Sequence, residues 1–230
     1  MIDESVKSQS KPIIYEVQAL NYNPQRISQY YEKRSHTYNQ DTHNRQYRGP
    51  QYMVDYLASL YPKGASQSGD HDLAVDIGDR TVEILDAGCG TGLVGIALRE
   101  KGYRHIDGFD LSEGMVAKAR QTGAYRSLIG GCNMLQRIPA YSDNEYIITL
   151  CCGVFTTGLV PPIALMELIR VTKPGGVVLV STRKSYYETQ DFKQTYEKLA
   201  QAGAIELIDC VMDGPYLAEE GAHYWAFKVL

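Results

Sequence analysis

The sequence predicts an α/β fold with a doubly wound, mostly parallel, Rossmann-like sheet, and three observations indicate it. From residue 82 onward, short apolar runs typical of buried strands alternate with patterns typical of helices. A glycine-rich turn follows the first run at residues 88–92, and a second strand with an acidic residue at its end comes about 20 residues later. The last two apolar runs are joined by a short segment without a helical pattern, which favours an antiparallel hairpin. The sheet should therefore have seven strands and an antiparallel C-terminal hairpin.

The N-terminal part of the chain precedes this alternation. Residues 1–24 are polar at first and then mixed, so we expect a flexible arm. Residues 27–34 carry large side chains at helical spacing, and residues 50–60 form a second helical pattern with a proline in its first turn. Residues 64–80 are rich in Gly, Ser and Asp, which indicates an exposed loop.

Residues 81–230 should form the sheet and its helices. The expected strands span residues 82–87, 105–109, 126–129, 146–152, 176–182, 204–211 and 223–229. The expected helices between them span residues 92–101, 113–121, 161–171 and 188–202. A chain of 230 residues suits one domain, which we place at residues 25–230, with a helical segment at 25–63 ahead of the core.

Two glycine patterns overlap in the turn after the first strand. Gly88, Gly90 and Gly92 follow the strand directly. The dinucleotide pattern G-x-G-x-x-G needs Gly90, Gly92 and Gly95 and starts late. The carboxylate of Asp86 beside the turn would repel a pyrophosphate but would tolerate an ammonium or sulfonium group. We therefore expect a nucleoside-like cofactor that is cationic and free of phosphate, with a dinucleotide as the alternative.

Asp110 ends the second strand and can accept hydrogen bonds from both hydroxyl groups of a ribose. Its alternative role is to cap the next helix. Ser112 suits that role better, because Glu113 and the helical pattern follow it. We therefore assign ribose binding to Asp110.

These residues resemble a known family. Residues 85–92, Leu-Asp-Ala-Gly-Cys-Gly-Thr-Gly, resemble motif I of class I S-adenosylmethionine-dependent methyltransferases, and Asp110 matches the acid that those enzymes place on the ribose. Residues 171–180 resemble the turn into the family's fifth strand. More narrowly, the chain looks like the methyltransferase-like proteins named for the Williams–Beuren syndrome critical region. The closer likeness is carried by Tyr31, Tyr38, residues 47–50, Gly158, Val160, Pro161 and residues 180–183.

The resemblance implies S-adenosylmethionine as the cofactor and an N-terminal helical lid over it. Asp86 would hold the ammonium group of the cofactor, directly or through water, and the amide oxygen of Asn133 would accept a hydrogen bond from the adenine amino group. Tyr38 and Arg48 match positions that relatives place over the cofactor. The expected cofactor contacts are Tyr38, Arg48, Asp86, Gly88, Gly90, Asp110, Leu111, Met115, Asn133, Met134 and Cys151.

The sequence identifies no catalytic residue. Residues 150–155, at the end of the fourth strand, lack the acidic or Asn-Pro-Pro-Tyr motif of relatives that methylate amide nitrogen or nucleobases. Methyl transfer needs a base only if the acceptor is protonated, and His223 is a weak candidate because a lone histidine is more often structural. We expect a methyltransferase that acts on a small molecule. The alternatives are a cofactor-binding protein without methylation activity and a dinucleotide-dependent oxidoreductase.

Charge and cysteine content agree with a cytoplasmic protein. The formal net charge of −4 gives no general attraction to nucleic acid or to an anionic membrane, and we expect neither as a partner. The pairs Lys33–Arg34 and Arg183–Lys184 are expected to be solvated. The five cysteines include no C-x-x-C spacing, so we expect free thiols and no metal site. Cys151 and Cys152 should point to opposite faces of a strand.

Overall fold

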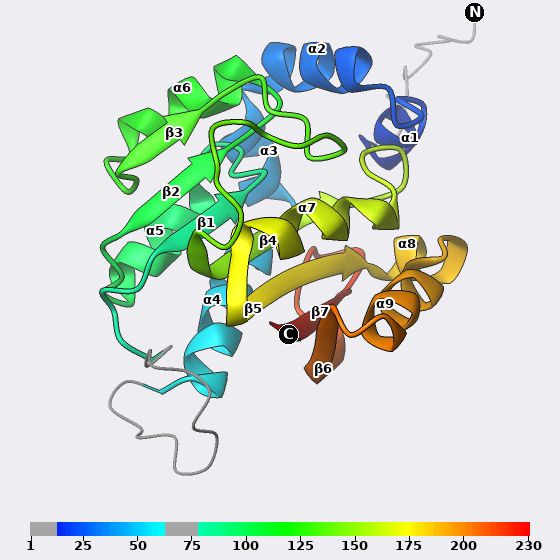
Figure 1. Ribbon diagram of the computed structural model, residues 1–230. Helices are drawn as coiled ribbons and strands as arrows, with labels where there is room; N and C mark the ends of the chain where they lie inside the picture. The colour runs from blue at the N-terminus through cyan, green and yellow to red at the C-terminus, as the bar shows by residue number, and fades with distance from the viewer. Residues whose placement is uncertain (1–12, 63–77) are drawn as a thin grey trace, which may run out of the picture.

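The computed structural model describes residues 13–62 and 78–230 and contains a seven-stranded sheet in the order β3-β2-β1-β4-β5-β7-β6 (Figure 1). Neighbouring strands from β3 to β5 pair in parallel, whereas β7 is antiparallel to both β5 and β6. The predicted sheet and its antiparallel hairpin are therefore confirmed. The strands are β1 Ile84–Ala87, β2 Ile106–Phe109, β3 Ser127–Ile129, β4 Tyr146–Phe155, β5 Thr172–Arg183, β6 Ile205–Gly214 and β7 Ala222–Val229.

The helices lie largely where the sequence predicts them. They are α1 Ile13–Gln18, α2 Pro24–Arg34, α3 Tyr38–Asn44, α4 Gly49–Leu60, α5 Leu93–Glu100, α6 Glu113–Gln121, the short 3₁₀ helix η1 Pro162–Ala164, α7 Leu165–Val171, α8 Lys184–Thr189 and α9 Phe192–Gln201. The single helix expected at 188–202 is wrong, because the chain breaks between α8 and α9. Tyr186 and Phe192 are both fully buried in one core cluster, and a continuous helix would turn them about 120° apart.

Helices cover both faces of the sheet. One core cluster joins α4 and α5 to one face, and a second joins α7, α8 and α9 to the other. Along β4, Leu150 and Cys152 belong to the first cluster, and Cys151 belongs to the second. This alternation confirms that the two adjacent cysteines point to opposite faces.

Helices α1 and α2 lie beyond the ends to which the arrows of β1, β2 and β3 point, whereas α4 lies at the other end of the molecule (Figure 1). Asn23 caps α2, since its side-chain oxygen accepts from the Arg26 N–H at 3.0 Å. Glu32, in the last turn of α2, accepts from the Ser112 hydroxyl at 2.9 Å and from the Gly114 N–H at 2.7 Å. A carboxylate at this position also complements the N-terminal dipole of α6.

The flexible arm expected at residues 1–24 does not extend over residues 13–24. Residues 13–18 form α1, and Val17 and Leu20 are buried against Ile27 and Leu159. Apolar burial therefore holds this part of the chain in place. Residues 1–12 and most of the loop expected at 64–80 lie outside the described residues. Within the described ranges, every helix is too short or too polar to cross a bilayer.

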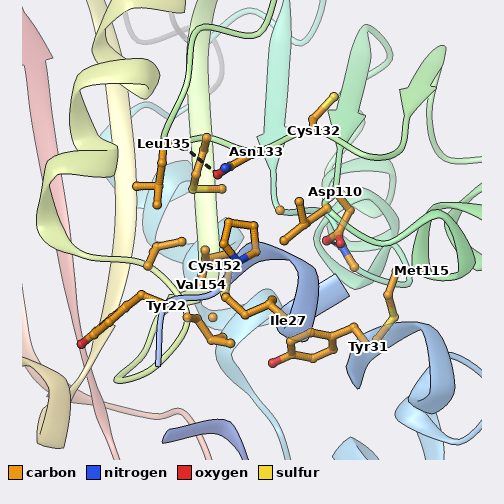
Figure 2. A pocket seen from close by; sticks show the side chains of 18 of the residues that line it. Tyr22, Ile27, Tyr31, Asp110, Met115, Cys132, Asn133, Leu135, Cys152 and Val154 are labelled. Carbon is orange, nitrogen blue, oxygen red and sulfur yellow. Dashed lines mark hydrogen bonds between the residues drawn. The ribbon is translucent and has the colours of Figure 1, made fainter. Parts of the chain in front are cut away.

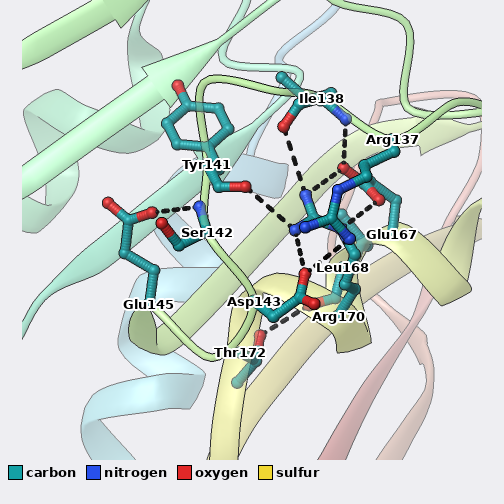
Figure 3. Close-up of polar contacts among 10 residues, drawn as sticks. All are labelled: Arg137, Ile138, Tyr141, Ser142, Asp143, Glu145, Glu167, Leu168, Arg170 and Thr172. Carbon is teal, nitrogen blue, oxygen red and sulfur yellow. Dashed lines mark hydrogen bonds and ion pairs between the residues drawn. The ribbon is translucent and has the colours of Figure 1, made fainter.

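Arg170 of α7 anchors the long connection between β3 and β4 to this helix (Figure 3). Its guanidinium donates to Glu167 at 2.6 and 2.8 Å and to Asp143 at 2.5 Å. It also donates to the backbone oxygens of Tyr141 at 3.0 Å and Ile138 at 3.4 Å. Because Glu167 in turn accepts from the Ile138 N–H at 2.8 Å, the connection is held from both sides.

Candidate functional site

A cavity opens at the carboxyl ends of β1, β2 and β4, where a doubly wound sheet binds its ligands (Figure 2). Its empty volume is about 740 Å³, part of which is open to solvent. Figure 2 shows Ile27 and Tyr31 of α2 on one side and Cys132 and Asn133, from the connection after β3, on the other. The lining residues are Tyr22, Pro24, Ile27, Tyr31, Tyr38, Gly88, Gly90, Asp110, Leu111, Met115, Cys132, Asn133, Met134, Leu135, Cys152, Gly153, Val154, Leu159 and Val160.

The glycine turn forms the floor of this cavity. Gly88 and Gly90 have φ values of +75° and +53°, in the left-handed region that favours glycine. A β-carbon at Gly90 would meet no other atom within 4 Å, so this backbone faces open space. A β-carbon at Gly88 would lie 2.5 Å from Cγ2 of Val154. Backbone therefore forms the cavity surface at Gly90, where a ligand can approach closely.

Asp110 lies in the cavity wall with its carboxylate anchored by backbone. Oδ2 accepts from the Gly90 N–H at 2.9 Å, and Oδ1 accepts from the Ser112 N–H at 2.9 Å. Burial raises the pKa of this carboxyl, while these hydrogen bonds lower it. Each carboxylate oxygen keeps further acceptor capacity for a ligand hydroxyl. Ser112 caps α6 as predicted, since its Oγ accepts from the Met115 N–H at 3.2 Å.

Asp86 does not itself line the cavity and is fully buried beside the turn, so of the two expected ways to hold an ammonium group, directly or through water, the second suits its position better. Its Oδ2 accepts from the Tyr125 hydroxyl at 2.6 Å, and this hydroxyl in turn accepts from the Gly95 N–H at 3.1 Å. Oδ1 is buried and has no hydrogen-bond partner among the residues that the structure describes. Burial raises the pKa of Asp86 to about 7, although the Tyr125 bond opposes the shift. A buried oxygen without a partner is costly, and a cationic or donor group nearby would relieve that cost.

Apolar residues and one amide form the far wall of the cavity. Leu111, Met115 and Met134, all three among the expected cofactor contacts, line it together. Asn133 also lines it, but its amide oxygen already accepts from the Leu135 N–H at 3.0 Å. That oxygen keeps a second lone pair, so its predicted role as acceptor stays a prediction, and the NH₂ group of Asn133 adds donors for a ligand.

Three residues considered at the sequence level lie away from the cavity. Cys151 is fully buried in the opposite core cluster, and its neighbour Cys152 lines the cavity instead. Arg48 is exposed at the start of α4, where its backbone N–H donates to the Tyr216 oxygen at 2.7 Å and its backbone oxygen accepts from the Tyr52 N–H at 3.0 Å. His223 accepts from the Asp213 N–H through Nδ1 at 2.8 Å, which is a structural role.

A second cavity of about 580 Å³ adjoins the first, and sequence reasoning missed most of it. Both cavities are lined by Tyr31, Tyr38, Gly153 and Leu159. The second is also lined by Val17, Tyr30, Arg34, Asp41, Thr42, Arg45, Tyr47, Thr156, Arg183, Tyr216 and Leu217. Its residues come from the N-terminal helices, the ends of β4 and β5 and the β6–β7 connection, so no local sequence signal unites them.

Gly153 lies where the two cavities meet. Its φ is +79°, and its N–H donates to the Ser181 hydroxyl at 2.9 Å. A β-carbon there would lie 2.6 Å from the Tyr47 hydroxyl oxygen and 3.1 Å from that of Tyr216. Two phenolic hydroxyls therefore flank the junction, and glycine is the residue that leaves room for them.

Of the pair Arg183–Lys184, which was expected to be solvated, only the lysine is exposed. Arg183 is buried, with a side-chain exposure of 6%, whereas Lys184 is 46% exposed. Arg183 donates through Nε to Glu220 at 2.8 Å, and Glu220 also accepts from the Ser185 N–H at 2.8 Å. The expectation for Arg183 was wrong because its partner is 37 residues away in the sequence.

Comparisons of the sequence with known proteins find methyltransferases. Residues 84–176 match the sequence model of a methyltransferase domain family. Methyltransferase-like protein 27 of Homo sapiens is 33% identical over 180 residues, which are 77% of this chain and 67% of that protein. Malonyl-[acyl-carrier protein] O-methyltransferase of Serratia marcescens is 34% identical over 143 residues, 55% of this chain and 52% of its own length. The chain thus spans about half the length of this second relative.

Solved structures share the fold at low sequence identity. A TehB-like S-adenosylmethionine-dependent methyltransferase from Corynebacterium glutamicum is similar with a TM-score of 0.58 and 19% identity, over 86% of this chain and 99% of that one. Magnesium protoporphyrin IX methyltransferase from Synechocystis, solved with bound S-adenosylmethionine, has a TM-score of 0.54 and 17% identity, over 78% and 79% of the two chains. At these identities the likeness concerns the fold.

Proposed function

The chain belongs to the class I S-adenosylmethionine-dependent methyltransferases, and we propose that it transfers a methyl group from S-adenosylmethionine to a small-molecule acceptor. The observation that carries this proposal is the pair of adjoining cavities. The first contains the glycine turn and Asp110, and the second meets it at Gly153. Such an arrangement suits a cofactor in one cavity and an acceptor in the other.

The residues of the first cavity fit the cofactor. Asp110 has acceptor capacity left for ribose hydroxyls, and the open space over Gly90 leaves room for the methionine part. The unpartnered Oδ1 of Asp86 is buried beside the turn, where it favours a nearby ammonium group, directly or through water. Met115 and Met134 offer apolar surface to adenine, and the Asn133 NH₂ group offers a donor to a ring nitrogen.

When bound, the sulfonium group of the cofactor supplies an activated methyl group. The protein then has to align the acceptor with that group and exclude water. Tyr31 and Tyr38 line both cavities and so contact both halves of the junction. We assign them the exclusion of water, and we assign alignment to the backbone at Gly153 and to the hydroxyls of Tyr47 and Tyr216 beside it.

Two facts support a small acceptor. The second cavity is built within one chain, from elements that surround it on several sides. The relative from Serratia marcescens is named for O-methylation of a malonyl group on an acyl carrier protein, which is a small acyl group presented by a carrier. A net charge of −4 does not favour nucleic acid as the acceptor.

Calorimetric titration with S-adenosylhomocysteine tests the cofactor assignment. We expect binding by the parent protein and no binding of NAD or NADP. Asp110→Asn should weaken binding by about tenfold or more, since bonds to a charged group are worth about 1.5–3 kcal/mol each. Asp191→Asn is the matched control, because Asp191 is exposed and its side chain makes no cap hydrogen bond. Equal affinity in Asp110→Asn and the parent would contradict the assignment.

Transfer itself is tested with a cofactor labelled on its methyl group and an extract of small metabolites. We expect label in a product of low molecular mass. Binding of S-adenosylhomocysteine without any labelled product, in this extract or with the acids named below, would instead favour a binding protein that does not methylate.

A further inference from the structure

Arg183 presents unused hydrogen-bond donors to the second cavity. Its guanidinium is buried, and Nη2 lies 2.6 Å from the same Glu220 oxygen that Nε binds. Despite this short distance, Nη2 has no partner that meets hydrogen-bond geometry within residues 13–62 and 78–230. The ion pair with Glu220 therefore offsets the charge but leaves donors of the planar group without partners. A buried donor in this state is stabilised by any acceptor that enters the cavity.

The charged groups of this lining favour an anion. Three guanidinium groups line the cavity, those of Arg34, Arg45 and Arg183, together with one carboxylate, that of Asp41. The Asp41 carboxylate accepts hydrogen bonds from Arg34 at 2.6 Å and from the Thr37 hydroxyl at 3.1 Å. Arg45 and Arg183 pair with glutamates that are not among the lining residues.

The two carboxylates among the described lining residues are already engaged, Asp41 by Arg34 and Thr37 and Asp110 by the N–H groups of Gly90 and Ser112. None of the lining residues is a histidine or a lysine. Burial raises the pKa of the Tyr38, Tyr47 and Tyr216 hydroxyls well above the ordinary value, and it raises the pKa of the Cys152 thiol to about 12. These groups stay protonated near neutral pH, so they do not act as bases, and their protons can be donated in hydrogen bonds. An acceptor methylated here should therefore arrive with its nucleophile already ionised.

We propose that the second cavity binds a small carboxylic acid, with the buried Arg183 guanidinium holding its carboxylate, and that the product is the methyl ester. This inference rests on the proposed function and specifies its acceptor. A carboxylate is ionised at neutral pH, and it matches the fork of an arginine. Aromatic residues such as Tyr30 and Tyr216, with Leu159 and Leu217, provide the amphipathic wall for the rest of the acid.

The step is balanced without a base. A lone pair on a carboxylate oxygen forms the new O–CH₃ bond, and the CH₃–S bond breaks with its electron pair staying on sulfur. One negative and one positive charge disappear together, and no proton moves. The hydroxyls of Tyr47 and Tyr216 beside Gly153 would orient the carboxylate as donors.

Binding of acids and their amides to the protein saturated with S-adenosylhomocysteine tests the proposal. The probes are hexanoate, 3-phenylpropionate and monoethyl malonate, each compared with the corresponding primary amide by calorimetry. We expect at least one acid to bind at least tenfold more tightly than its amide. Arg183→Met should remove this preference, while the affinity for S-adenosylhomocysteine stays within twofold of the parent. Arg137→Met is the control, because Arg137 also forms an ion pair, with Asp143, but is 60% exposed and lies outside both cavities.

A second variant controls for misfolding of Arg183→Met, in which Glu220 is left buried without its cation. Arg183→Met combined with Glu220→Gln removes both charges and should lose the preference for acids in the same way. Acids and amides that bind equally, no binding of either class, or a preference unchanged in the arginine variants would overturn the proposal. Failure of S-adenosylhomocysteine to bind the parent would instead contradict the proposed function.

The chemical stability of the product gives an independent readout. With a cofactor labelled on its methyl group and the same acids, a methyl ester releases volatile labelled methanol in mild alkali. Methyl groups on nitrogen, carbon or phenolic oxygen stay attached. We expect alkali-labile label that falls at least tenfold in Arg183→Met. Label that resists alkali, or no label with a bound acid, would overturn the methyl ester.

Discussion

The hydroxyl of Thr91 donates a hydrogen bond of 2.6 Å to the side-chain oxygen of Asn39. Thr91 belongs to the glycine turn and is 2% exposed, whereas Asn39 lies in α3. The bond therefore ties the N-terminal helices to the turn across 52 residues of sequence. The same helices carry Tyr31 and Tyr38, which line both cavities. We infer that the position of this segment and the conformation of the turn depend on each other.

We predict that bound S-adenosylhomocysteine slows amide exchange in residues 27–48 and changes exchange in β6 little. A segment that admits ligands belongs to the less stable part of a protein, and a ligand stabilises what it contacts. Hydrogen exchange with and without the ligand measures the difference. Equal protection of residues 27–48 in both states would refute the lid.

Thr91→Val should speed exchange in residues 27–48 without the ligand. The substitution keeps the shape of the side chain but leaves the Asn39 oxygen without its donor, at a cost of about 1 kcal/mol. Thr195→Val is the control, because that hydroxyl bonds only to the Asp191 oxygen on the exposed side of α9. An effect of equal size in both variants would show that the bond to Asn39 has no special role.

Gly90→Ala should abolish most cofactor binding while the protein stays folded. Its new methyl group would enter open cavity space, so the folded chain would bear only the strain of a positive φ, about 1–2 kcal/mol. Gly123→Ala is a close control, because Gly123 has a φ of +65° and equally open surroundings but lies outside the cavity. We expect similar losses in thermal stability and a tenfold or greater loss of S-adenosylhomocysteine affinity for Gly90→Ala alone.

Affinity for S-adenosylhomocysteine should rise by about tenfold from pH 6 to pH 8. The pKa of Asp86 is about 7 in the folded protein, and a bound ammonium group favours its ionised form. Asp110, whose pKa burial also raises, acts in the same direction. Asp86→Asn should reduce the pH dependence, as calorimetry at several pH values would measure. An unchanged pH dependence in this variant would exclude Asp86 as its source.

The same group should make the protein without ligand less stable as pH rises from about 4 to 7. The folded state keeps a proton on Asp86 in this window, whereas the unfolded state has lost it, given an ordinary pKa of 3.8. Because the unfolded state binds fewer protons, the free energy of unfolding falls with pH. Urea titrations of the parent and Asp86→Asn should show a smaller fall in the variant.

Arg170→Met should lower the free energy of unfolding by about 2–3 kcal/mol, because it removes charge-assisted bonds to a partly buried network. Exchange should also quicken around Asn133, whose connection this arginine holds (Figure 3). Lys193→Met is the control, since Lys193 and Glu197 form an exposed pair at 3.8 Å, and its effect should stay within about 0.5 kcal/mol. A change of that small size in Arg170→Met would show that the network is dispensable.

Periodicity and turn chemistry predicted the sheet because both are local. The seven strands and the cap at Ser112 depend on residues that lie within a few positions of each other. Predictions of helix and strand ends failed where the burial of a side chain determines the end. The break between α8 and α9 follows from two aromatic residues that must face one core, and β4 continues to Phe155 because that side chain is also buried there.

The sequence predicted the glycine turn and Asp110 of the site correctly, but it predicted the positions of the other charged side chains less well. The cavity is lined by Gly88, Gly90 and Asp110 as the motif suggests. Asp86 lies outside it, held by a tyrosine 39 residues away. Arg48 was chosen from the right segment, but Arg45, at the end of α3, is the arginine that lines a cavity. Partners distant in sequence decide these outcomes, and no local pattern records them.

The two tyrosines shared by the cavities imply that both ligands leave by the same conformational change. Because Tyr31 and Tyr38 line both cavities, we predict that one outward movement of α2 and α3 opens both at once. Departure of the spent cofactor and of the product should then share one rate constant, and turnover cannot exceed it. Slowing that movement, for instance by raising solvent viscosity, should slow the release of both to the same degree.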